Sequence, residues 1–104
     1  MARLRWTEPA LRDLDQVAEY IALDNPRAAA RLVRKTFDSV ERLKKFPKSG
    51  RRPQELPSTV YREVVVPPCR VFYRVAGETI YILHVMRAER LLRPYLLEQK
   101  DRQK

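Results

Sequence analysis

The stretch from Cys69 to Arg93 limits the possible folds of this chain more than any other part of it. It reads CRVFYRVAGETIYILHVMRAERLLR, and its apolar and polar residues alternate on both sides of Ala76-Gly77-Glu78. Alternation with a period of two is typical of a strand that buries one face, and a glycine-containing turn between two such runs predicts a β-hairpin. Because one face of this hairpin is apolar, the fold must supply a layer that covers it.

Two amphipathic helices precede the hairpin and supply this layer. Residues 2–6 alternate as a short strand does, and Thr7 is a typical helix N-cap, followed by Pro9 in the first turn. Apolar residues then recur at helical spacing as far as Asp24-Asn25-Pro26, where Asn25 is placed to cap a second helix. Because the connection is so short, we expect the two helices to lie antiparallel and side by side.

The remaining segments complete an α+β fold. A loop rich in Pro, Gly and Arg runs to Pro57, and strands are predicted at 61–66, 70–75 and 79–86. We predict a terminal helix over 88–99 and a frayed polar tail over 100–104. The prediction is one domain, 1–104: an N-terminal strand, an antiparallel helical hairpin, then three antiparallel strands that form one sheet covered by the helices, and a short C-terminal helix. The other face of the sheet is expected to be partly open.

Charge is the most unusual feature of the composition. The formal net charge is +9, which predicts a polyanionic partner, either nucleic acid or an acidic protein. Between Ser49 and Gln99 every basic residue is arginine, whose planar fork suits contacts with carboxylate and phosphate. The sequence contains neither an export signal nor an apolar run long enough for a membrane helix, so we expect a cytoplasmic protein. It also has no metal-ligand spacing and no glycine-rich loop, so neither a metal nor a cofactor is expected.

The order of elements and several local motifs carry a family resemblance. The segments LRWTEPALRDLDQVAEYIALDNPRAAARLV, KKFPKSGRR and RVFYRVAGETIYILHVMRAER together resemble the RelE/ParE superfamily of bacterial toxins from type II toxin-antitoxin systems. The resemblance runs from about Leu4 to about Leu92. It implies a cognate antitoxin that holds the toxin inactive. RelE-type toxins cut messenger RNA on the ribosome, whereas ParE-type toxins poison DNA gyrase.

The set of residues that RNA cleavage needs is incomplete in this sequence. Such cleavage needs groups to accept and donate protons and a cation to stabilise the phosphorane. RelE-like enzymes use lysines on the strand and preceding loop, but this chain has none between Ser49 and Gln99. The residues left for a nuclease site are Arg62, Glu63, His84 and Arg87. We expect His84 to be a buried structural histidine that shares a face with Ile80 and Ile82. No catalytic residue is predicted, and a ribosome-dependent ribonuclease stays the alternative.

A ParE-type toxin acts by binding its target, so it needs contact surfaces and no catalytic residues. This chain resembles ParE in its long helical hairpin, in HVMRAERLL at the end of the last strand, and in the absence of the nuclease lysines. The resemblance implies DNA gyrase as the target. We expect the arginines to bind this target, because one guanidinium makes several charge-assisted bonds. The predicted target-binding residues are Arg70, Arg74, Arg87, Arg90 and Arg93.

The resemblance also implies a ParD-like antitoxin with an acidic C-terminal segment that lies across the helical hairpin and the sheet. The residues predicted to bind it are Leu14, Tyr20, Phe37, Val40 and Arg62. For Leu14, Phe37 and Val40, ordinary core packing explains the same helical spacing. A homodimer or a toxin–antitoxin heterotetramer is compatible with this interpretation. A basic nucleic-acid-binding domain is a third interpretation, and it predicts binding that weakens steeply with salt.

Overall fold

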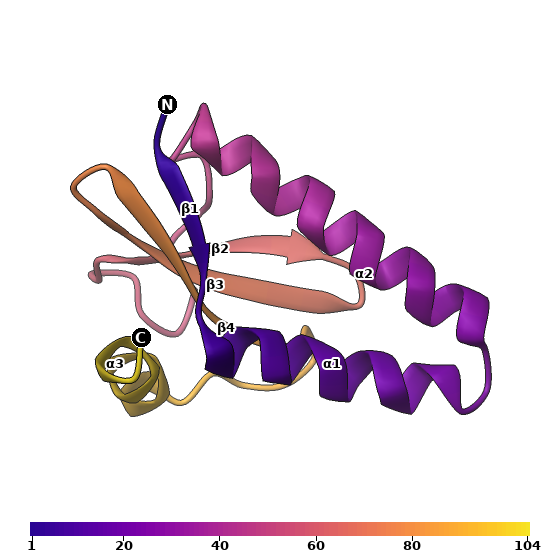
Figure 1. Cartoon of the computed structure of the whole chain (residues 1–104). Helices are drawn as coiled ribbons and strands as arrows, with labels where there is room; N and C mark the ends of the chain where they lie inside the picture. Colours follow the sequence, from indigo (N-terminus) through magenta and orange to yellow (C-terminus); the bar gives the residue numbers. More distant parts are fainter.

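The computed structural model describes residues 1–104 and contains four strands and three α-helices. In chain order the elements are β1 (Arg3–Trp6), α1 (Glu8–Ala22), α2 (Pro26–Glu41), a 3₁₀ turn η1 (Arg42–Lys44), β2 (Tyr61–Val66), β3 (Cys69–Ala76), β4 (Thr79–Arg87) and α3 (Pro94–Arg102). Figure 1 shows α1 and α2 as a hairpin beside the sheet, with α3 apart from them. The predicted α+β class and order of elements are confirmed.

The strands form one sheet in the order β1-β4-β3-β2. Strands β2, β3 and β4 pair antiparallel, as predicted for the hairpin and the strand before it. Strand β1 pairs parallel with β4, so that Leu4 lies opposite Ile80 and Trp6 opposite Ile82. The complete sheet is therefore mixed, because the helical hairpin returns the chain to the far edge before β2 begins.

Side-chain caps fix the start of each helix of the hairpin. The hydroxyl of Thr7 accepts a hydrogen bond from the Ala10 N–H at 3.3 Å and donates one to the Ile82 carbonyl at 2.7 Å. Asn25 Oδ1 accepts from the Ala28 N–H at 3.1 Å, and Pro26 opens α2. Both predicted N-caps are confirmed. The second bond of Thr7 also joins the start of α1 to β4, so one hydroxyl fixes the position of the helix on the sheet.

The main core lies between the helical hairpin and the sheet. Its buried members are Ala10, Leu14, Leu32, Val40, Leu43, Val66, Cys69, Val71, Tyr73, Ile80, Ile82 and Val85. Leu14 is 3% exposed and Val40 is fully buried, so neither side chain is available to an antitoxin. Of the two explanations given for these positions, the structure supports core packing, because the apolar stripes of both helices face the sheet.

The second face of the sheet is partly covered, and Val65 on this face remains 43% exposed. Helix α3 supplies the cover, and Tyr61, Phe72, Leu83, Leu92 and Leu97 form a smaller buried cluster beneath it. The predicted helix over 88–99 is displaced toward the C-terminus, because Arg93 precedes Pro94 and is held in an extended conformation. The expected frayed tail is also wrong in part, since α3 continues to Arg102 and Asp101 is buried. None of the helices combines the length and the apolar character needed to cross a membrane.

Candidate functional site

A cleft of about 870 Å³ lies between α1 and the chain that leaves β4. Its lining residues are Asp13, Gln16, Val17, Tyr20, His84, Val85, Met86, Arg87, Glu89, Arg90, Leu91, Arg93 and Leu96. Three of the five predicted target-binding arginines, Arg87, Arg90 and Arg93, are among them. The structure therefore brings these three arginines to one concave surface, which we call the arginine cleft.

The arginines of the cleft differ in their pairing. Arg87 Nε donates to Glu89 Oε1 at 2.7 Å, and this bond raises the pKa of Arg87. The side chains of Arg90 and Arg93 are exposed and form no ion pair. Leu91, between them, is 83% exposed, and Tyr20 on the opposite wall is 70% exposed. The cleft thus presents free guanidinium groups beside exposed apolar and aromatic side chains, a combination typical of protein-binding surfaces.

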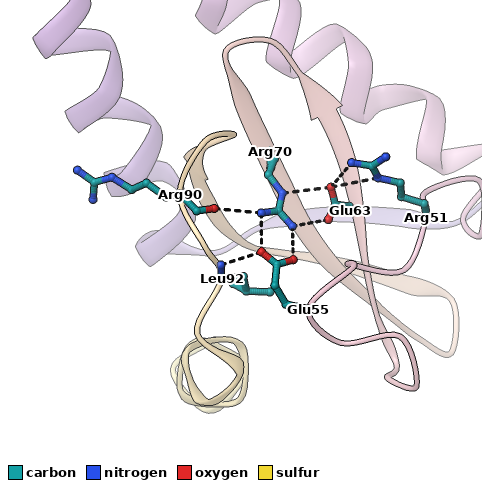
Figure 2. Close-up of polar contacts among 6 residues, drawn as sticks. All are labelled: Arg51, Glu55, Glu63, Arg70, Arg90 and Leu92. Atoms are coloured by element: carbon teal, nitrogen blue, oxygen red, sulfur yellow. Dashed lines mark hydrogen bonds and ion pairs between the residues drawn. The ribbon is translucent and has the colours of Figure 1, made fainter.

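Arg70 does not belong to this surface. Its side chain is 8% exposed and its guanidinium is bonded to Glu55 and Glu63 (Figure 2). These two carboxylates raise the pKa of Arg70. The prediction of Arg70 as a target-binding residue is wrong, because its donors are already used inside the molecule.

Arg74 is also engaged internally. Its Nη1 donates to Asp101 Oδ2 at 2.6 Å, and its side chain is 36% exposed. Arg70 and Arg74 do share the face of the sheet that α3 covers, since Arg70 lies over Phe72 and Arg74 reaches α3. On this face, however, both arginines anchor loops and α3 and neither faces the cleft.

A second polar group, formed by Asp13, His84 and Lys100, joins α1, β4 and α3. His84 Nδ1 lies 2.8 Å from Asp13 Oδ2, and Lys100 Nζ lies 3.2 Å from Asp13 Oδ1. Burial alone would raise the pKa of Asp13, but the bonds from His84 and from the Val85 N–H, together with the charge of Lys100, lower it below its ordinary value. Asp13 and His84 line the cleft, and their contacts with Lys100 join α1, β4 and α3.

The residues considered for a nuclease do not converge. Arg62 Nη1 donates to the Gly50 carbonyl at 2.9 Å, whereas the carboxylate of its neighbour Glu63 is fully buried between Arg51 and Arg70. Neighbours on a strand point to opposite faces, so Arg62 and Glu63 are not placed to act together. Phe72 lies between Glu63 and His84 in the register and stacks on the His84 ring, with centroids 5.8 Å apart.

His84 is buried, as expected, but not on the expected face. The register of β3 and β4 shifts between Phe72 and Tyr73, so Ile82 lies opposite Tyr73 while His84 lies opposite Phe72. Ile80 and Ile82 belong to the core under the helical hairpin, whereas His84 stacks on the other face of the sheet. The prediction that His84 shares a face with the two isoleucines is therefore wrong.

Among the residues predicted to bind an antitoxin, only the two aromatic ones are exposed. Tyr20 lies on the wall of the arginine cleft, and Phe37 on α2 is 38% exposed. One side of the Phe37 ring packs on Trp6, with ring centroids 4.8 Å apart. Arg62 is half-buried and bonded to Gly50. The helical hairpin thus exposes two aromatic side chains to a partner, Tyr20 on α1 and Phe37 on α2.

The residues that sequence reasoning missed are the acidic partners. Glu55 pairs with Arg70 from 15 positions away, and Asp101 pairs with Arg74 from 27 positions away. Asp13 approaches His84 from 71 positions away. Helical and strand periodicity report only neighbours along the chain, so the local pattern carried no signal for these pairs.

Comparison with known proteins identifies the family. The profile of the ParE toxin of the type II toxin-antitoxin system parDE matches residues 4–92. A protein named as a toxin, Y4kP of Sinorhizobium fredii, is 43% identical over 88 residues, which are 83% of this chain and 88% of that protein. Toxin RelE2 of Caulobacter vibrioides is 36% identical over 92 residues, which are 88% of this chain and 100% of that toxin.

A solved structure agrees with these sequence matches. A chain in the structure of the chromosomal ParDE TA system from P. aeruginosa superposes with a TM-score of 0.71 and 29% sequence identity. The match covers 86% of this chain and 98% of the other. The family profile runs from Leu4 in β1 to Leu92, so it includes Arg87 and Arg90 of the arginine cleft and ends one residue before Arg93. This chain therefore belongs to the ParE toxin family of type II toxin-antitoxin systems, within the RelE/ParE superfamily.

Proposed function

We propose that this protein inhibits DNA gyrase by binding to it through the arginine cleft. The observation that carries the proposal is that Arg90 and Arg93 are exposed on the cleft and have no carboxylate partner. Arginine and tyrosine are enriched at binding hot spots, where a guanidinium makes several charge-assisted bonds and an aromatic ring buries a large area. Arg87, Arg90 and Arg93 form the proposed target contact, with Tyr20 on the facing wall as its aromatic anchor.

A cognate antitoxin with an acidic C-terminal segment is the proposed inhibitor of the toxin. Membership of the ParE family and the likeness to a ParDE system support this partner. The net charge of +9 favours an acidic segment, since complementary charge speeds association and selects partners. Of the residues predicted to contact it, we retain Tyr20 and Phe37, whose rings are exposed on the helical hairpin.

A ribosome-dependent ribonuclease is the second candidate, which the name of the relative RelE2 favours. It would need a side chain free to accept the 2′-hydroxyl proton. Glu63 is a poor base for an external substrate, because its carboxylate is fully buried and accepts bonds from Arg51 and Arg70. His84 is already bonded to Asp13 through Nδ1. These contacts support binding over RNA cleavage as the activity.

Two assays on one preparation of the purified protein test the proposal. The first follows supercoiling of relaxed plasmid by DNA gyrase, and the second follows messenger RNA cleavage on ribosomes. We expect supercoiling to be inhibited while the transcripts stay intact. Cut transcripts together with normal supercoiling would establish the ribonuclease and contradict the gyrase proposal.

A further inference from the structure

The segment that carries the free arginines, residues 88–93, is neither helix nor strand. Exposed connections of this kind are mobile unless their backbone groups are bonded to the rest of the fold. Here the Ala88 N–H donates to the Pro68 carbonyl at 2.8 Å. Within the turn, the Arg90 N–H donates to the Arg87 carbonyl at 3.1 Å. Two further bonds involve distant side chains: the Arg90 carbonyl accepts from Arg70 Nη1 at 3.3 Å, and the Leu92 N–H donates to Glu55 Oε2 at 2.9 Å. Glu55 and Arg70 therefore hold the backbone on both sides of Leu91.

The geometry around Arg70 uses all its donors. Glu63 accepts from Nε at 3.2 Å and from Nη2 at 2.7 Å, while Glu55 accepts from Nη2 at 2.8 Å and from Nη1 at 3.0 Å. Each carboxylate thus faces one edge of the guanidinium in a bidentate arrangement (Figure 2). The fifth donor position reaches the Arg90 carbonyl. A lysine has no planar fork and cannot make this set of contacts.

The charges in this group balance. Glu63 also accepts from Arg51, so two arginines meet two glutamates. The bonds with Arg70 lower the pKa of Glu55 to about 2, so Glu55 remains ionised throughout the neutral range. Burying such charges costs free energy that well-packed apolar side chains would not cost, so an ion pair of this kind is weak evidence for stability. Its directional bonds are better suited to fixing the position of a segment.

We propose that Glu55 and Arg70 are positioning residues for the arginine cleft. They hold residues 90–92 so that the side chains of Arg90 and Arg93 stay on the cleft wall while Leu92 is buried beneath them. In Figure 2, the backbone carbonyl of Arg90 points to Arg70, whereas the Arg90 guanidinium points away from Arg70 and the two glutamates. The inference rests on the proposed function, because it assigns these two residues a role in presenting the gyrase contact.

The test compares Glu55→Gln with Glu8→Gln in the full chain. Both substitutions remove one negative charge, but Glu8 pairs only with Arg12 on an exposed face of α1. Glu55→Gln leaves the pair of Glu63 and Arg70 in place, so the core contacts of the network are kept. The readouts are the amide hydrogen exchange rate of Leu92, the thermal midpoint, and the concentration that half-inhibits gyrase.

We expect Glu55→Gln to speed Leu92 exchange and to raise the half-inhibiting concentration about tenfold, while Glu8→Gln changes neither. Arg70→Lys should act in the same direction, because it keeps the charge and loses the fork. Combining substitutions in one variant distinguishes a positioning role of Glu55 from a merely structural one. Added to Arg90→Ala/Arg93→Ala, Glu55→Gln should cause no further loss of inhibition, because the arginines through which it acts are already absent.

The inference would be overturned if Glu55→Gln had the same half-inhibiting concentration as the parent. It would also be overturned if Glu55→Gln weakened inhibition in the triple variant as much as it does alone. If the parent protein itself does not inhibit gyrase, the proposed function fails while Leu92 exchange still decides the positioning role. Faster exchange in Glu55→Gln than in Glu8→Gln would then support the role of Glu55 in holding the segment. Equal exchange in the two variants would overturn it.

Discussion

The carboxylate of Asp13 on α1 lies 2.8 Å from Nδ1 of His84 on β4, although the two residues are 71 positions apart. Strand β1 pairs with β4 only from Thr79 to Ile82, so the Val85 N–H has no strand partner at this edge. Asp13 Oδ2 accepts from this N–H at 3.2 Å. The side chain of Asp13 therefore satisfies the sheet edge where β1 ends, and it fixes α1 at the wall of the arginine cleft.

The first prediction concerns Asp13→Asn. The amide lacks the negative charge that pairs with Lys100 and bonds to His84, so we expect the free energy of unfolding at pH 7 to fall by about 1–3 kcal/mol. The folded pKa of Asp13 is depressed, so its contribution is complete above the ordinary aspartate pKa of about 4 and is lost as the pH falls through the folded value. The difference between parent and variant should therefore shrink in more acidic solution.

Urea denaturation of both proteins at pH 7 and at pH 3 measures this difference. Asp15→Asn, an exposed site on the same helix, is the matched control and should have almost no effect. A difference between parent and Asp13→Asn that is the same at both pH values would show that the charge of Asp13 does not matter.

The second prediction concerns the end of the chain. Asp101 accepts from Arg74 and from Lys104, each at 2.6 Å, and from the Tyr61 hydroxyl at 3.2 Å. Asp101→Asn should lower the free energy of unfolding by about 1–3 kcal/mol, because it removes two ion pairs and leaves buried groups less well paired. Thermal denaturation should show no comparable change for Asp24→Asn, which is exposed in the turn between α1 and α2. Unchanged stability of Asp101→Asn would mean that the last turn of α3 is frayed.

The third prediction concerns Gly50. A Cβ atom at this position would lie 2.5 Å from the Tyr73 hydroxyl and 2.7 Å from the Glu63 carbonyl oxygen. The Tyr73 hydroxyl accepts from the Gly50 N–H and donates to the Pro47 carbonyl, so it has little freedom to move. Gly50→Ala should therefore destabilise the fold by about 1–3 kcal/mol through overpacking.

Gly77 provides the contrast. It turns between β3 and β4 with a φ of 61°, and no atom would lie within 4 Å of an added Cβ. Asparagine tolerates this left-handed conformation, so Gly77→Asn should cost less than Gly50→Ala. Chemical denaturation of both variants decides the question, and equal losses would contradict the steric explanation for Gly50.

The secondary structure was largely predictable because its signals are local. Strand β2 has the predicted bounds, Tyr61–Val66, and both helices of the hairpin start at the predicted caps. The segment before Pro94 was mistaken for helix. Its backbone is held instead by Glu55 and Arg70, which lie far away in the sequence. Propensity alone cannot report such partners.

The candidate site was predictable only in part, for two physical reasons. One irregularity in the pairing of β3 and β4 reverses which face His84 occupies, and nothing in the alternating pattern marks its place. The arginines looked equivalent in sequence, but burial and carboxylates distant in the sequence make some of them structural and leave others free. Arg70 and Arg74 are bonded within the fold, whereas Arg90 and Arg93 remain free on the cleft.

The most direct test of the central proposal is the gyrase supercoiling assay with Arg90→Ala/Arg93→Ala. Arg27→Ala/Arg31→Ala removes the same charge from the exposed face of α2 and serves as the control. Losing two hot-spot arginines should raise the half-inhibiting concentration at least about thirtyfold, while the control inhibits like the parent. Equal inhibition by parent, cleft variant and control would contradict the proposal that the free arginines of the cleft bind gyrase.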